Sequence, residues 1–248
     1  MSSGSFRLAD LRSSKAYQRL QGVRRLAYIG GYRLRYQPFR VVFAALCLAA
    51  STGAAFGQSS GFDFYVLSLS WSPTYCASPQ GQRSSQQCDG EGDYAFVVHG
   101  LWPQREQGYP EFCPSREPQR VPQALGETMF DIMPSMGLIG HQWRKHGSCS
   151  GLSQSDYLSQ TRAAFERVVI PAALAEGENR LTLSAADIET AFVTANPDMS
   201  TGGIAASCEG RLLEEVRICL TKDLQFRDCA EVDRRGCRLD RIELPPVN

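Results

Sequence analysis

Cysteines constrain the fold of this 248-residue chain more than any other feature of its sequence. Eight of its nine cysteines lie far from the N-terminus, at Cys76, Cys88, Cys113, Cys149, Cys208, Cys219, Cys229 and Cys237. Their number is even, and no two are spaced as a C-x-x-C pair, which disfavours a redox motif or a zinc ribbon. In an exported chain such a set predicts disulfides, although eight cysteines allow about 105 connectivities. The sequence therefore predicts a disulfide-stapled domain, provided that the chain leaves the cytosol.

The N-terminal segment predicts that export. The first forty residues hold nine Lys or Arg and one acid, and the apolar run 41–50 follows. This run is too short to span a bilayer, which takes about 20 apolar residues, and Ala55-Phe56-Gly57 has the small-x-small pattern of a cleavage site. We expect residues 1–57 to be a targeting signal that is removed after Gly57 and sends the protein to the periplasm or the medium. Because the basic region is long for a signal, an internal start and an uncleaved tether stay open.

Removal of this segment would make the protein acidic. The whole chain has 26 Lys and Arg and 26 Asp and Glu, so the loss of nine bases and one acid leaves 17 against 25, a formal charge near −8. Proteins that hold a polyanion stably do so through many Lys and Arg contacts to phosphate. The charge therefore disfavours a stable nucleic-acid binder and favours an enzyme with a local cationic pocket that releases its product.

Residues 58–248 are expected to fold as one domain, because they contain no repeat and no low-complexity linker. Strand patterns cover 62–71, 94–99 and 213–220, and helix patterns cover 122–133, 138–146, 155–169 and 184–195. Ser153-x-x-Asp156 and Ser184-x-x-Asp187 are typical of helix N-termini. Because strands and helices do not alternate strictly, the pattern predicts an α+β domain with a central, mostly antiparallel sheet flanked by helices.

The three histidines indicate the chemistry, because all of them fall in two short segments. His99 opens the run His-Gly-Leu-Trp-Pro, and we expect it at the end of a strand, just before a Trp-Pro turn. His141 and Lys145 are four apart, and so are Gln142 and His146, so a helix would place all four on one patch. Folding must then bring the two segments together.

Such a patch suits cleavage of RNA without a metal. A neutral imidazole removes the proton of the ribose 2′-hydroxyl, the oxygen attacks phosphorus, a protonated imidazole gives its proton to the leaving 5′-oxygen, and a lysine stabilises the phosphorane. The product is a 2′,3′-cyclic phosphate, which hydrolysis converts to a 3′-phosphate. DNA lacks the 2′-hydroxyl and is not expected to be cleaved, and we expect neither a metal nor another cofactor.

The motifs also resemble a known family. The segments His99-Gly-Leu-Trp-Pro103 and His141-x-Trp-x-Lys-His146-Gly-Ser-Cys149 are similar to the two active-site signatures of the ribonuclease T2 family, endoribonucleases of secretory, vacuolar and periplasmic compartments. The likeness covers nearly all of 62–237 and includes the bacterial periplasmic ribonucleases. It implies a monomeric enzyme that cleaves single-stranded RNA with little base specificity and does not associate stably with membranes once its signal is removed.

The resemblance assigns roles to five catalytic residues. It implies that His146 is the general base, His99 the general acid, His141 a phosphate-orienting group and Lys145 the group that stabilises the transition-state charge. Gln142 departs from the family, which usually has glutamate there. A glutamine keeps the hydrogen-bonding reach of glutamate but not its charge, so we expect activity with an altered rate or pH dependence.

The resemblance also implies substrate contacts and disulfides. Trp102 and Tyr109 align with base-stacking rings, and Gln104 aligns with an aspartate that reads the base, so any preference for one base stays open. The implied disulfides are Cys76–Cys88, Cys113–Cys149, Cys208–Cys237 and Cys219–Cys229.

Three rival interpretations can be weighed from the residues. A zinc protease needs His-Glu-x-x-His, whereas His141 and His146 are five apart and lack the glutamate. A Cys–His nucleophile is disfavoured because the cysteines are expected to be paired. A catalytically impaired secreted relative that binds RNA or a protein partner stays open, with Gln142 as its mark. Trp71 and Trp143 are expected in the core, and His141 alone could be mainly structural.

Overall fold

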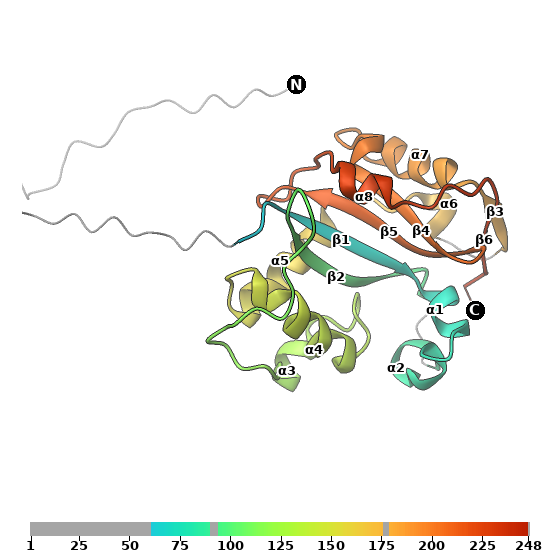
Figure 1. Ribbon diagram of the computed structural model, residues 1–248. Coiled ribbons are helices and arrows are strands. Elements are labelled where there is room, and N and C mark those ends of the chain that lie inside the picture. The colour runs from blue at the N-terminus through green and yellow to red at the C-terminus, as the bar shows by residue number, and fades with distance from the viewer. Residues whose placement is uncertain (1–60, 90–93, 176–178, 248) are drawn as a thin grey trace, which may run out of the picture. The chain divides into compact units, whose positions relative to one another are not determined.

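The computed structural model describes residues 61–89, 94–175 and 179–247 (Figure 1). The predicted signal segment 1–57 lies outside these residues. The described part contains a six-stranded sheet in the order β2-β1-β5-β6-β3, with β4 paired to β5. The strands are β1 (Phe64–Trp71), β2 (Phe96–Gln104), β3 (Leu181–Leu183), β4 (Ile204–Glu209), β5 (Leu212–Leu220) and β6 (Ile242–Leu244). Only the pairing of β5 with β6 is parallel among these strands, so the predicted α+β domain with a mostly antiparallel sheet is confirmed.

The described helices flank this sheet. They are α1 (Ser72–Ala77), α2 (Ser85–Cys88), α3 (Gln123–Glu127), α4 (Met136–Lys145), α5 (Gln154–Glu166), α6 (Ala172–Ala175), α7 (Ala185–Ala195) and α8 (Ala230–Arg234). In Figure 1, α4 and α5 lie beside β2, and α7 lies beside β4, in agreement with their contacts. None of the helices in the described ranges is long and apolar enough to cross a membrane.

Local sequence explains where the predicted helices begin. Ser153 and Ser184 each accept a hydrogen bond from a backbone N–H three residues later, as the motifs predicted, and Asp187 completes a capping box at α7. The predicted helix 122–133 is wrong in extent, because α3 ends at Glu127. There the Thr128 hydroxyl donates to the Leu125 carbonyl at 2.7 Å and competes with the helical pattern.

The core lies mainly on one face of β1. Tyr65, Leu67, Leu69 and Trp71 alternate along the strand as predicted, and each is at most 3% exposed. Trp143 of α4 is 1% exposed, so both tryptophans that were expected in the core are there. The opposite face of β1 carries Phe64 and Val66 in a second, smaller apolar cluster and then Ser68 and Ser70. The site is built on this face, since Val66 lines the same cavity as the histidine motifs.

Four disulfides join the cysteines in the pairing that the family resemblance implied. Cys113–Cys149 connects the loop after β2 to the segment that follows α4. Cys219–Cys229 connects β5 to the start of α8. The first crosslink therefore ends within the second histidine motif, and the second joins two elements that line the same cavity as the histidines.

The prediction that a strand ends at His99 is wrong, because β2 continues to Gln104. Pro103 is tolerated there because β2 is an edge strand, whose outer side needs no N–H donor. Ser68 pairs with Gly100 and Leu69 with Val98, so His99 is an extra residue in a β-bulge. In the same way Glu214 is extra between β5 and β4, where Ser207 pairs with Glu215 and Cys208 with Leu213.

Candidate active site

The two histidine segments meet at a cavity of about 390 Å³ between β2, β5, α4 and α8. All eight predicted catalytic and substrate-binding residues line it: His99, Trp102, Gln104, Tyr109, His141, Gln142, Lys145 and His146. A second cavity of about 700 Å³ shares His99, His141, Glu214 and Glu215 with the first. We call the two together the active-site groove. Both bulged residues, His99 and Glu214, line both of its parts.

The bulge at His99 lets this residue line the same cavity as Trp102 and Gln104 of β2.

Gly100 is required where α4 approaches strand β2. A Cβ at this position would lie 2.2 Å from Gln142 Oε1 and 2.5 Å from Trp102 Nε1, closer than atoms can approach. The absence of a side chain at Gly100 thus allows the helix motif to reach the strand motif.

Helix α4 is fixed by its buried neighbours. The Ser135 side chain caps its start, and Trp143 Nε1 donates to the Pro118 carbonyl at 2.8 Å. Gly147 follows the helix in a position where a Cβ would lie 2.5 Å from the Trp143 ring and 2.7 Å from Tyr157. The helix end is therefore closely packed, and His146 occupies the C-cap position next to the groove.

His146 is the buried histidine of the site. It is 5% exposed, and its Nδ1 has no hydrogen-bond partner among the described residues. Burial and the positive charges of Lys145, His99 and His141 lower the pKa of His146 to about 3. Its ring is therefore neutral in mildly acidic and neutral solution, which is the state of a proton acceptor.

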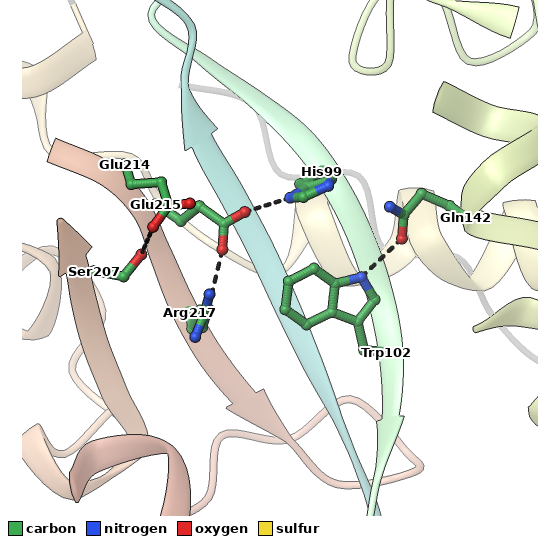
Figure 2. A network of polar contacts seen from close by, with 7 residues as sticks. All are labelled: His99, Trp102, Gln142, Ser207, Glu214, Glu215 and Arg217. Atoms are coloured by element: carbon green, nitrogen blue, oxygen red, sulfur yellow. Dashed lines mark hydrogen bonds and ion pairs between the residues drawn. The ribbon is translucent and has the colours of Figure 1, made fainter. Parts of the chain in front are cut away.

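His99 is only partly buried, with 36% of its side chain accessible. Its Nδ1 contacts Oε1 of Glu215, and because a carboxylate only accepts, Nδ1 donates the proton in this bond. Glu215 Oε2 accepts from Arg217 Nε at 3.0 Å (Figure 2). Burial would raise the pKa of Glu215, but the hydrogen bond and charge of His99 and the charge of Arg217 outweigh it and lower that pKa. The Nε2 atom of His99, on the other side of the ring, is left for the groove.

Trp102 connects the two histidines. Its ring stacks on His146 at a centroid distance of 5.2 Å and meets His99 edge-on at 5.4 Å. Its Nε1 donates to Gln142 Oε1 at 2.8 Å (Figure 2). Gln142 is 2% exposed and offers the acceptor that a glutamate would also offer, so the departure from the family motif keeps this contact. Trp102 therefore acts as a spacer within the site.

The remaining predicted residues lie around this centre. Lys145 Nζ is 3.8 Å from Glu111 Oε2, and both side chains are partly exposed, so this ion pair is weak. Burial and the charges of Lys145, Arg144 and His99 lower the pKa of His141. Tyr109 is 43% exposed, and its ring centroid lies 6.3 Å from that of His146.

The sequence analysis missed charged residues of the groove, among them Glu215, Arg217 and Glu231. Glu231 Oε2 accepts from the backbone N–H of Gly108 at 2.7 Å and so holds the loop that carries Tyr109. A signal for Glu215 and Arg217 was present, because these two charges, separated by one residue, share a face of a largely apolar strand. Among the described residues no three His, Cys, Asp or Glu side chains cluster as metal ligands would.

Comparison with known proteins identifies this arrangement. A model of the ribonuclease T2 family matches residues 62–229. A ribonuclease of Aeromonas hydrophila is 36% identical over 192 residues, covering 74% of this chain and 84% of the relative. Ribonuclease DdI of Dictyostelium discoideum is 30% identical over 193 residues, covering 71% and 82%.

Solved structures share the fold. An RNase-related protein from Calystegia sepium matches with a TM-score of 0.61 and 23% identity, over 75% of this chain and 98% of its own. RNase NT in complex with 5′-AMP matches with a TM-score of 0.59 and 24% identity, over 75% and 98%. The match of the family model across most of the sheet and both histidine motifs, together with these relatives, shows that the chain belongs to the ribonuclease T2 family.

Proposed function

We propose that this protein is an endoribonuclease that cleaves single-stranded RNA by attack of the ribose 2′-hydroxyl, without a metal or another cofactor. Membership of the family and the ribonucleases among its relatives support RNA endonuclease activity. The observation that carries the mechanism is the placement of His99 and His146 in one groove with opposite surroundings. His99 has a buried carboxylate, Glu215, as its partner. His146 is buried among positive charges.

In the first step His146 acts as the base. Its neutral ring takes the proton of the 2′-hydroxyl while the oxygen forms a bond to phosphorus. His99, protonated on both nitrogens, gives its Nε2 proton to the 5′-oxygen as the bond between that oxygen and phosphorus breaks. The products are a 2′,3′-cyclic phosphate and a free 5′-hydroxyl. In the second step His99 takes a proton from water as the water oxygen bonds to phosphorus, and His146 returns its proton to the 2′-oxygen as the bond between that oxygen and phosphorus breaks, which leaves a 3′-phosphate and a free 2′-hydroxyl.

The negative charge of the transition state needs cations in the groove. Lys145 and His141 are one helical turn apart on α4, and both line the cavity beside His99 and His146. Positive groups held at the place where charge develops lower the barrier, and a low-dielectric wall strengthens their effect. Lys145 supplies this charge, and His141, whose lowered pKa favours the neutral ring, orients the phosphate by hydrogen bonding. A local cation of this kind allows an acidic protein to act on a polyanion and release the product.

The proposed low base specificity follows from the side chains at the mouth of the groove. Tyr109 and Trp102 offer ring faces, and stacking is tolerant of sequence because every base has a π-face. The Gln104 amide has a donor and an acceptor and can pair with several base edges. DNA is not a substrate of this mechanism because it has no 2′-hydroxyl.

We propose further that residues 1–57 are a signal and that the mature enzyme, 58–248, works as a monomer in the periplasm or outside the cell. Four disulfides fit an oxidising compartment. The monomer is supported by the groove, to which a single chain contributes both histidine segments.

The test is cleavage of a short RNA by the processed protein in EDTA between about pH 4 and pH 8, a range that spans the ordinary pKa of histidine. Cyclic phosphate ends from the parent, and none from a His146→Ala variant, are expected. A folded parent that binds RNA but leaves it intact at every pH would overturn the proposal in favour of a catalytically impaired binding protein.

A further inference from the structure

We propose that Glu215 is the positioning residue of the general acid: its buried carboxylate, held between His99 and Arg217, aims Nε2 of His99 at the leaving-group oxygen. This inference rests on the proposed function and adds to it a residue outside both histidine motifs. It also assigns a purpose to a carboxylate that is 3% exposed in the middle of the sheet.

The contact between Glu215 and His99 reaches across a strand. β5 and β2 both pair with β1, so β1 lies between these two residues. Opposite them β1 carries Ser68 and Ser70, whose small side chains leave room above the sheet. Figure 2 shows the Glu215 side chain extending over β1 to the imidazole. A larger residue at Ser68, which is 0% exposed, would fill this passage.

A carboxylate is required chemically at this position. One of its oxygens accepts from His99 Nδ1 and the other from Arg217 Nε. Glutamine has a single acceptor oxygen and would have to turn its amide N–H groups toward one of these two donors. The negative charge also faces His99, which must carry a positive charge before it can give a proton to the leaving group. Glu215 is thus suited to hold the orientation of this ring and to face the proton donor of the proposed mechanism.

The surroundings of His99 explain why a fixed orientation is needed. The charged and titratable groups that line the groove with His99 include Glu214, Glu215 and Arg217 of β5, together with His141 and Lys145 of α4 and His146 at its C-cap. The Glu214 carboxylate accepts from Ser207 Oγ at 3.2 Å, on the side of β4. Glu215 is the carboxylate that contacts Nδ1 of His99. Without Glu215 the partly exposed ring could rotate and present either nitrogen to the groove.

The decisive experiment compares two leaving groups in a Glu215→Gln variant. A dinucleoside phosphate has a 5′-alkoxide leaving group that must be protonated, whereas uridine 3′-(para-nitrophenyl phosphate) releases a phenolate that needs no proton. We expect kcat on the dinucleotide to fall about 10- to 100-fold, a part of the 10²–10⁴ that general acid–base catalysis contributes, with KM within about threefold. On the aryl ester the loss should stay below about fivefold, since acid catalysis is not needed there.

Two further variants interpret that result. His99→Ala should show the same dependence on the leaving group as Glu215→Gln. The double variant should lose little more activity than His99→Ala alone, because the Glu215 carboxylate acts through the His99 ring. Glu189→Gln is the matched control: this carboxylate of α7 is half-buried and accepts from the Ala206 backbone N–H, away from the groove. Its kinetics on both substrates should equal those of the parent.

The possible outcomes separate the positioning role from the proposed function. If Glu215→Gln loses equal activity on both substrates, or keeps the activity of the parent on the dinucleotide, the positioning role is overturned. If the parent enzyme is itself inactive on both substrates, the proposed function is overturned instead. If Glu215→Gln does not fold, nitrogen NMR of the parent protein takes its place. We expect neutral His99 to carry its proton on Nδ1, and a proton on Nε2 would contradict the inference.

Discussion

His99 and His146 are the same side chain in opposite settings, although their rings are separated by a single indole. His99 is partly exposed on a bulge of β2 and donates to a buried carboxylate. His146 is buried at the end of α4, has no hydrogen bond to Nδ1 within the described residues, and faces the cations of its own helix. In the proposed mechanism the environment of each ring, rather than its residue type, therefore decides which histidine acts as the acid and which as the base.

The proposed division of roles between His99 and His146 also explains the residues beside them, Glu215 and Gln142. Glu215 contacts Nδ1 of His99 and so fixes the orientation of that ring. A nearby carboxylate would raise the pKa of a buried imidazole, and Gln142 beside Trp102 adds no such charge on the side of His146. The glutamine in place of the family's glutamate is therefore consistent with a base of unusually low pKa.

The largest effect is expected from removal of the base. His146→Ala should lower kcat on RNA by about 10³- to 10⁴-fold, near the upper end of what general base catalysis contributes. His141→Ala, which leaves both proton-transfer groups in place, should lose less. Single-turnover cleavage of a short RNA measures both, and a larger loss from His141→Ala would reverse the roles assigned to the two histidines.

Removal of the crosslink next to His146 should have the next largest effect. Cys149→Ser opens the disulfide with Cys113, and loss of a native disulfide commonly costs about 2–5 kcal/mol of stability. We expect a lower melting temperature together with lower activity, because the end of α4 carries the base. Calorimetry in the presence and absence of reductant checks this, and unchanged melting of the variant would contradict the assignment.

The pH dependence of the parent sharpens the comparison. The pKa of His146 is lowered from 6.5 to about 3, so the ring stays in its accepting form throughout this interval. We expect kcat/KM, which reports the free enzyme, to be maintained as the pH falls from about 6.5 to about 4. A tenfold fall per pH unit that begins near the ordinary pKa of histidine would show that the buried ring is not protected.

The lowered pKa of His146 also makes the stability of the fold depend on pH. Between pH 6.5 and about 3 the unfolded chain protonates this histidine and the folded chain does not, so stability falls as the pH is lowered through this interval. In a His146→Gln variant this part of the pH dependence should be absent. Denaturant unfolding at several pH values measures it, and equal slopes for parent and variant would contradict the account.

The smallest effect is expected from Gln142→Glu. The carboxylate keeps an acceptor for Trp102 Nε1 but adds a negative charge to the groove, which raises the pKa of a neighbouring imidazole. We expect kcat to change less than about tenfold and the acid limb of kcat/KM to move to higher pH. An unmoved limb would show that residue 142 does not influence the base.

The sequence predicted the parts of the site that depend on local pattern. Helical spacing placed His141, Gln142, Lys145 and His146 on one patch, and the family motif paired the cysteines correctly. The strand end at His99 was predicted wrongly, because a bulge depends on the register with β1, which has no local signal. Glu215 was missed for a related reason, since its partner lies 116 residues away and two strands across the sheet.

The most direct test of the division of labour is a crossed measurement of kcat/KM for His99→Ala and His146→Ala on a dinucleoside phosphate and on uridine 3′-(para-nitrophenyl phosphate), in EDTA. The account predicts that His146→Ala loses activity on both substrates, because the 2′-hydroxyl proton must be removed in either case. It predicts that His99→Ala loses activity on the dinucleotide and keeps most of it on the aryl ester. The opposite pattern, with His146→Ala active on the aryl ester, would show that the acid and the base have been assigned to the wrong histidines.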